Sequence, residues 1–209
     1  PDGYKKQTSY YDLGGGKYAE SVRDSVHPGR EYAVIRDARG RVVEKLEPNN
    51  VRIAYGYDSA GLLTSLVNTD GLETRMCYDS LGRRTSITDP DAGTSLYAYD
   101  DAGRLSWSRD ARGSVVRYEY DGLDRIVRID HPDDTPDVTY EYDDPAVANG
   151  IGRVSRIDDG VSVSSFAYDA KGRAAVKAQA IDGRTFVFRM DYDEAGRVTR
   201  LSYPDGTAV

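Results

Sequence analysis

The chain has 209 residues, of which 39% are hydrophobic and 30% are charged, enough for one sizeable domain or one elongated array. The formal net charge of −7 argues against a nucleic-acid partner, because phosphate binding needs a basic surface. No apolar run approaches the ~18–20 residues of a membrane span. Cys77 is the single cysteine, which excludes an internal disulfide framework and is compatible with export.

An internal repeat, marked by a Tyr-Asp pair, dominates the sequence. The pairs are first spaced by 21 residues, and the spacing then stretches to 22, 26 and 24. They begin at Tyr57, Tyr78, Tyr99, Tyr120, Tyr142, Tyr168 and Tyr192. Arg36-Asp37 holds the same position one repeat upstream, and Tyr11-Asp12 adds a looser copy. The chain therefore contains about nine units.

Each unit carries two turn signals. The first is a glycine four residues after the tyrosine, usually followed by arginine. These glycines are Gly40, Gly61, Gly82, Gly103, Gly172 and Gly196. In one copy Asp124 replaces the glycine, and we expect it to adopt the left-handed conformation that aspartate tolerates. The second signal has Pro-Asp-Gly character, as in Pro204-Asp205-Gly206, and suits turns that need positive φ.

The segments between the turns predict strands. Apolar and aromatic residues alternate with period two in residues 53–57, 116–120 and 186–192, which predicts strands with one buried face. In the strand after each Gly-Arg turn the apolar residues are three apart instead, as in Leu63 with Leu66. Because that spacing does not fit a regular strand, we expect a bulge or a strong twist there. Each unit is thus two strands and two turns, and no helical pattern appears.

The units form a single array over residues 1–209. Residues 1–30 hold degenerate units, and residues 31–209 hold regular units with a longer turn at 144–151. The chain opens on Pro1-Asp2-Gly3, and its last turn repeats that phase of the unit. Since a repeat array normally ends in atypical capping units, we expect this one to be an excerpt of a larger shell.

The repeated motif resembles that of the RHS/YD-repeat family. The family pattern is Tyr-x-Tyr-Asp-x-x-Gly-Arg-Leu/Val, and residues 97–105 match it without a gap. The resemblance covers residues 31–209 and, more loosely, 1–30. The stretch Asn149-Gly150-Ile151-Gly152-Arg153-Val154 also looks like the repeat region of bacterial insecticidal toxin complexes. Teneurins carry similar repeats, but the Gly-Arg-rich pattern favours the bacterial proteins.

The resemblance implies an all-β fold in which tandem β-hairpin YD repeats form a curved strip of a hollow RHS-type shell. It implies a structural role: the shell encapsulates a C-terminal toxin polypeptide in a secreted bacterial toxin. The implied partners are the remainder of the same shell, the enclosed toxin domain, and a secretion-system or toxin-complex subunit. The implied location is outside the cell or on its surface.

One motif raises the question of chemistry. Many family members carry a self-cleaving aspartate site in an Asp-Pro-x-Gly motif, which Asp89-Pro90-Asp91-Ala92-Gly93 superficially resembles. However, Pro90 stands in the repeat where Pro48 and Pro132 stand. We therefore interpret the segment as an ordinary turn.

The other candidate residues also lack the pattern of a metal-binding or catalytic site. The pairs Asp133-Asp134, Asp143-Asp144 and Asp158-Asp159 lack the spacing of calcium loops. His27 and His131 are too few and too far apart to predict a zinc site. Cys77 has no basic motif beside it. The sequence thus predicts no catalytic residue, no metal ligand and no cofactor, and we expect no enzyme.

Two alternatives remain open. The repeats could form a carbohydrate- or cell-surface-binding module, in which exposed tyrosines stack on sugars. Tyr55, Tyr97, Tyr118 and Tyr140 alternate as a buried face would, which disfavours it. Alternatively, two units of 21 residues match a propeller blade in size, but no blade signature recurs.

Overall fold

A computed structural model describes residues 6–24 and 31–209. The described residues contain β-strands and one short 3-10 turn, η1 (Pro48–Asn50), with no α-helix. Among the described residues, no helix has the length and hydrophobicity of a membrane span. The chain divides into two compact units, whose boundary falls after Tyr97 in β9; residues 110–112 belong to the first. Pro1-Asp2-Gly3 and His27 lie outside the described residues.

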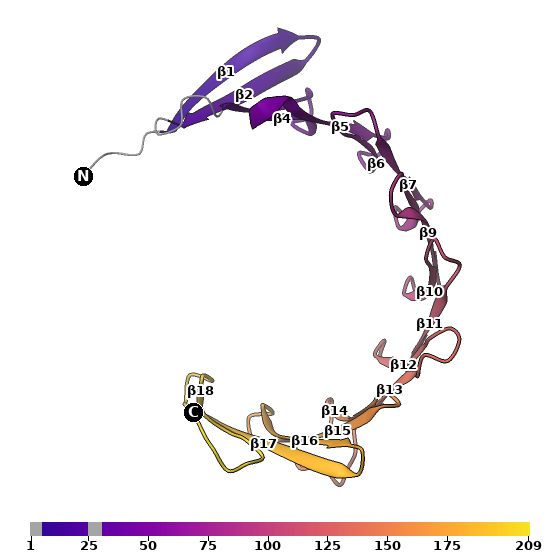
Figure 1. The fold of residues 1–209 in the computed structure, drawn as a ribbon, viewed down its shortest axis with the longest axis vertical. Helices are drawn as coiled ribbons and strands as arrows, with labels where there is room; N and C mark the ends of the chain where they lie inside the picture. Colours follow the sequence, from indigo (N-terminus) through magenta and orange to yellow (C-terminus); the bar gives the residue numbers. More distant parts are fainter. Residues whose placement is uncertain (1–5, 25–30) are drawn as a thin grey trace, which may run out of the picture. The chain divides into compact units, whose positions relative to one another are not determined.

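The first unit is an antiparallel meander, with each strand paired to the next in the chain (Figure 1). Its strands are β1 (Lys6–Gly14), β2 (Lys17–Asp24), β3 (Glu31–Arg36), β4 (Val42–Glu47), β5 (Val51–Tyr57), β6 (Leu63–Val67), β7 (Glu73–Tyr78), β8 (Arg84–Asp89) and β9 (Gly93–Tyr99).

The second unit repeats this arrangement. Its strands are β10 (Leu105–Arg109), β11 (Val115–Tyr120), β12 (Ile126–Asp130), β13 (Val138–Tyr142), β14 (Val154–Asp158), β15 (Ser162–Tyr168), β16 (Ala174–Ile181), β17 (Arg184–Tyr192) and β18 (Val198–Ser202). The all-β meander of hairpins expected from the repeat is therefore confirmed.

A bulge recurs beside the repeat tyrosine. In the β5–β6 pair, Tyr55 faces Leu66 and Tyr57 faces Leu63, so two steps on β5 span three on β6. The same shift occurs next to Tyr78, Tyr120, Tyr142, Tyr168 and Tyr192. The extra residue lies in the strand after the turn and brings apolar residues three apart onto one face. The bulge expected from that spacing is confirmed.

The turns have the expected backbone. The turn glycines adopt positive φ, and Asp124, which replaces one of them, has φ 63°. Asn50 and Asp182 do the same in the second turn type, at 62° and 49°. The longer turn lies between β13 and β14. Tyr11 lies in β1 opposite Ala19, so the first hairpin is longer than the regular units, as its degenerate sequence suggests.

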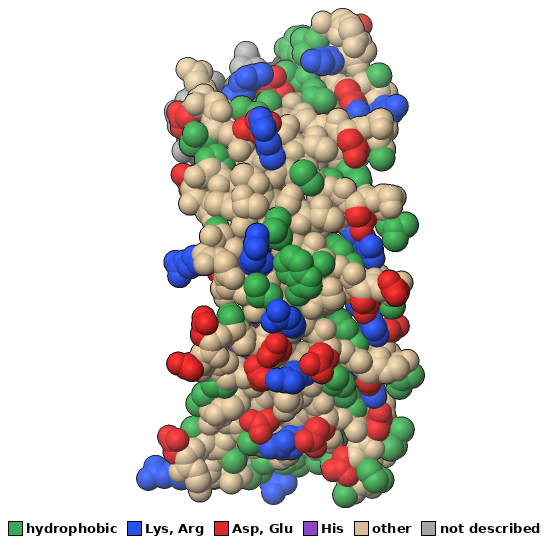
Figure 2. Space-filling model, turned by 90° about the vertical axis from the view of Figure 1, so that its right-hand side faces the viewer, with side chains coloured by type: hydrophobic (Ala, Val, Ile, Leu, Met, Phe, Trp, Pro, Cys, Tyr) green, Lys and Arg blue, Asp and Glu red, His purple; other side chains and the backbone are tan. Residues whose placement is uncertain are grey.

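The strands have two distinct faces. One, which we call the tyrosine face, carries the repeat tyrosines and the apolar residues paired with them, such as Tyr118 with Ile129. The other face carries charged residues in the second unit, and we call it the charged face. Its members are Arg117, Glu119, Arg128, Asp130, Glu141, Arg156 and Asp158. Figure 2 shows acidic and basic side chains intermingled on the side that it displays.

The expectation of a buried tyrosine face was wrong in degree. Ala19 and Met76 are the only apolar side chains buried within the described residues, and the tyrosines of the strands are mostly half-buried. Phe186 is 38% exposed. The physical reason is that each described unit is a single sheet without a second layer on its tyrosine face. Period two in a sequence reports which residues share a face, but not whether anything covers that face.

Two turn glycines allow the backbone requirement to be tested alone. Gly196 has φ +82°, whereas Gly122 does not have positive φ, and a Cβ on either would meet no atom within 4 Å. We predict that Gly196→Ala destabilises the chain by about 1 kcal/mol, while Gly122→Ala is neutral or slightly stabilising. Urea denaturation of both variants measures the difference, and equal stabilities would contradict the assigned turn geometry.

Candidate functional site

The most strongly repeated site in the molecule is a turn closed by an aspartate and an arginine. In six copies the aspartate N–H donates to the arginine carbonyl oxygen, at 2.8–2.9 Å. The arginine N–H donates to aspartate Oδ1, and its Nε donates to Oδ2 at 2.7–2.8 Å. The pairs are Asp37–Arg41, Asp79–Arg83, Asp100–Arg104, Asp121–Arg125, Asp169–Arg173 and Asp193–Arg197. Each turn is thus fixed by one carboxylate that accepts from both backbone and side chain.

The arginine also contacts the tyrosine of the next repeat. Its guanidinium lies 4.2 to 4.7 Å from the ring centroid in the pairs Arg41–Tyr57, Arg104–Tyr120, Arg125–Tyr142 and Arg173–Tyr192. The tyrosine hydroxyl then donates to a strand carbonyl just after that arginine, as Tyr120 does to Leu105 at 2.9 Å. We call the aspartate and arginine of one turn, together with the tyrosine of the next, a node.

Charge and burial both favour the node as built. Hydrogen bonds from the Arg41 side chain lower the pKa of Asp37. For Asp169, the backbone hydrogen bond from Arg173 is the main cause that lowers the pKa, and the hydrogen bond from the Arg173 side chain lowers it further. Burial raises the pKa of Tyr120, Tyr142 and Tyr168, so their hydroxyls stay protonated donors. The node is an ion pair stacked on a neutral phenol at neutral pH, and it offers no activated nucleophile or base.

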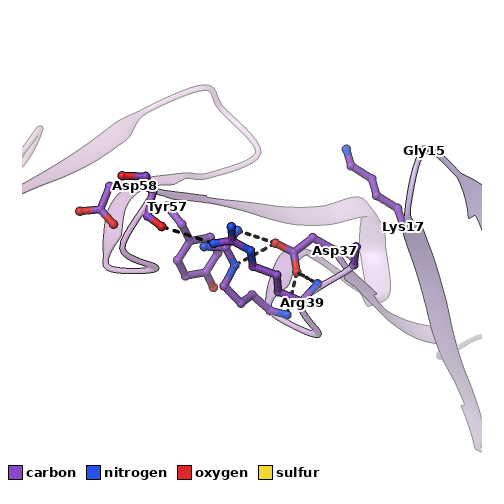
Figure 3. A pocket seen from close by; sticks show the side chains of 9 residues that line it. Gly15, Lys17, Asp37, Arg39, Tyr57 and Asp58 are labelled. Carbon is purple, nitrogen blue, oxygen red and sulfur yellow. Dashed lines mark hydrogen bonds and ion pairs between the residues drawn. The ribbon is translucent and has the colours of Figure 1, made fainter.

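One node opens onto a hollow in the first unit (Figure 3). The hollow has a volume of about 430 Å³ and is lined by residues of three turns, among them Gly15, Asp37 and Tyr57. Lys17 and Arg39 bring positive charge to its walls, and Arg39 donates to the Ser59 carbonyl oxygen at 3.3 Å. Asp37 pairs with Arg41, whose guanidinium lies over the Tyr57 ring. Asp37, Arg39 and Arg41 are thus engaged in holding turns together.

The Asp-Pro segment is placed as a turn. Asp89 accepts from the N–H groups of Asp91 and Ala92, and from the hydroxyl of Thr74 at 2.7 Å. The backbone hydrogen bond from Ala92 is the main cause that lowers the pKa of Asp89. A carboxylate held in this way stabilises the turn between β8 and β9.

The structure does not bring the other candidate residues together. Asp143 pairs with Arg125, and Asp158 pairs with Arg156. Asp159 accepts from the backbone and hydroxyl of Ser162. Within the part of the chain that is described, no three His, Cys, Asp or Glu side chains form a group suited to a metal ion. Cys77 is exposed.

Two of the four tyrosines considered for sugar stacking already have cations over their rings. Lys45 lies 5.9 Å from the ring centroid of Tyr55, and Arg84 lies 5.1 Å from that of Tyr97. Sequence reasoning read the motif arginine as a turn signal and missed its contact with the next tyrosine. The signal was present, because arginine precedes the tyrosine of the following repeat by a nearly constant 15–19 residues.

The repeated sequence matches a known family. A family model described as RHS Repeat matches residues 36–74, 78–108, 99–136 and 168–208, which is more than half of the chain. The chain belongs to the RHS-repeat family. No curated protein matches the sequence significantly.

Solved structures show the same fold for this RHS-repeat chain. The crystal structure of TcdB2-TccC3-TEV matches with a TM-score of 0.78 and 13% identity over 99% of this chain. The structure of the Photorhabdus luminescens Tc holotoxin pore also matches with a TM-score of 0.78 and 13% identity over 99% of this chain. The crystal structure of TcdB2-TccC3-Cdc42 matches with a TM-score of 0.74 and 13% identity over 98%. The chain spans 12–14% of the length of these structures. At this identity the likeness shows the fold.

The hydroxyl of the node tyrosine can be tested by deletion. We predict that Tyr120→Phe costs about 1 kcal/mol, because the Leu105 carbonyl loses its donor at 2.9 Å. Tyr118→Phe is the matched control on the same strand and face, since its hydroxyl forms no hydrogen bond within residues 6–24 and 31–209. Chemical denaturation compares the two, and an equal loss in both would contradict the role given to the node hydroxyl.

The node carboxylates predict a dependence of stability on pH. Their pKa values are lowered in the folded chain, as for Asp37, Asp169 and Asp193. The stability they contribute is therefore present above the unfolded pKa of about 3.9 and is lost as pH falls through the lower folded value. We predict a urea midpoint that falls steeply below about pH 4. Asp169→Asn lowers the midpoint at pH 7 and makes the pH dependence shallower; an unchanged profile would contradict this.

Proposed function

We propose that this RHS-repeat chain is a wall segment of a shell that encapsulates a C-terminal toxin polypeptide in a secreted bacterial toxin. The observation that carries the proposal is the node. It joins successive repeats edge to edge with side chains of the sheet itself, so each unit holds together without a conventional core. A wall needs this property, because both of its faces must be free to meet solvent or contents.

The comparisons support the same role. The related structures are Tc toxin assemblies, and the chain matches them over nearly its whole length. We propose that residues 1–209 form a single array within a longer shell. Its partners would be the remainder of that shell, the enclosed toxin polypeptide and a toxin-complex or secretion-system subunit. We further propose that the segment is exported with its parent and has no catalytic activity.

The proposal is tested by comparing access to the two faces in the full-length parent protein. In a Cys77→Ser background, Phe186→Cys places a thiol on the tyrosine face and Glu119→Cys places one on the charged face; both parent residues are exposed in this chain. A closed shell should protect one of these thiols from a bulky maleimide and leave the other reactive.

Mild denaturation should make the protected thiol reactive, and the isolated segment should react at both positions. Equal labelling of both thiols in the native parent would contradict the wall. Protection of one face without release of any polypeptide on denaturation would contradict the encapsulated toxin, but not the shell.

A further inference from the structure

The longer turn between β13 and β14 interrupts the series of nodes. Asn149-Gly150-Ile151-Gly152-Arg153 keeps the spacing of Asp169-Ala170-Lys171-Gly172-Arg173, but an amide stands where the regular turn has its carboxylate. The backbone also differs, since Asn149 has φ 56° and the Arg153 N–H donates to the carbonyl oxygen of Gly150. Arg153 is thus the arginine of a node whose aspartate, Asp143, donates its N–H to the Arg153 carbonyl oxygen at 3.1 Å but does not bind the guanidinium with its carboxylate.

Backbone carbonyl oxygens accept hydrogen bonds from some, but not all, of the guanidinium N–H groups that a node carboxylate would help to satisfy. The Nε of Arg153 donates to the Gly172 carbonyl at 2.9 Å, and its Nη1 donates to the carbonyls of Asn149 and Ile151, both at 3.0 Å. Its Nη2 has no acceptor among the described residues. The nearby Asp143 does not compensate, because Arg125 and the Gly152 N–H hold its carboxylate.

This guanidinium lines an open hollow of about 220 Å³ in the second unit. The other polar side chains around it are Asn149 and Lys171. Lys171 is exposed, and its ammonium donates to the Glu194 carbonyl oxygen at 3.4 Å. The carboxylate of Asp169, in the same turn, is held by Arg173 at 2.6 Å. The hollow therefore brings together two cations that have no carboxylate partner in the described chain.

We propose that this hollow, formed by Asn149, Arg153 and Lys171, is a binding site for a carboxylate group. A guanidinium suits a planar carboxylate, because its N–H donors lie in one plane and form charge-assisted hydrogen bonds. The Asn149 amide donates one N–H to the Tyr168 carbonyl oxygen at 3.3 Å, and its second N–H adds a neutral donor. The two N–H donors of Arg153 Nη2 and one ammonium match a monoanion, whereas the carboxylates of Asp143 and Asp169 nearby disfavour a dianion such as phosphate.

The test is an NMR titration of the chain with sodium acetate against sodium chloride at equal ionic strength. We expect saturable shifts at the Nε–H of Arg153 and the amide N–H of Gly172. Arg153→Gln should abolish them, and Lys171→Gln should weaken the apparent affinity by at least about threefold through the loss of one charge. Arg39→Gln is the matched control, because Arg39 holds the position of Lys171 in a turn of the other unit and should leave the titration unchanged.

Two further arms keep the result decisive. Arg153→Lys keeps the charge but loses the two fixed N–H donors of Nη2, so it should bind acetate more weakly than the wild type. Inorganic phosphate should bind no more tightly than acetate; tighter binding would overturn the assignment to carboxylates. Non-saturable shifts, or a titration that Lys171→Gln leaves unchanged, would overturn the site. Lys171 is exposed, so this last variant does not depend on whether Arg153→Gln folds normally.

Discussion

The pairing of one aspartate with one arginine across a five-residue turn is the interaction on which the rest of the structure depends. A sheet without a second layer buries little apolar surface, and within the described residues only Ala19 and Met76 are buried apolar side chains. The carboxylate satisfies two donors of its own turn and orients the guanidinium. The guanidinium then lies against the next tyrosine, whose hydroxyl returns to the strand behind it.

No single contact of this kind is strong. An exposed ion pair contributes about 0–1 kcal/mol, and a cation–π contact at such a site contributes roughly 0.5–1 kcal/mol. The repeats gain from having the same contacts at many junctions, so that the total grows with the number of such units. Stability is therefore spread along the sheet. The aromatic residue is tyrosine because its ring gives area to the stack and its hydroxyl reaches a carbonyl that would otherwise lack a side-chain donor.

Much of this could be predicted from the sequence, because the repeat fixes the turns and strands in phase. The spacing of three between Leu63 and Leu66 indicated the bulge, and the position of Asp124 indicated its left-handed backbone. The degree of burial could not be predicted, since alternation is the same in a covered and an uncovered sheet. The Arg–Tyr contact was also missed: it joins residues of different repeats, and its partners become neighbours only when the strands pair. The altered turn at Asn149 was visible in the sequence as an insertion, but the contacts of Arg153 could be seen only in the structure.

The alternation of side chains along each strand has a consequence for how such a chain can change in length during evolution. One residue added within a regular strand would move every following side chain to the opposite face and separate tyrosine from arginine. Residues added in a turn leave the faces unchanged, as the six from Asp144 to Asn149 do. Paired extension of two strands is equally harmless: β16 and β17 are longer than their neighbours, yet they stay in register to Ile181 and Arg184 around a two-residue turn. Insertions and deletions should therefore be accepted in turns, in matched strand pairs or as whole repeats, and rejected as single residues within a strand.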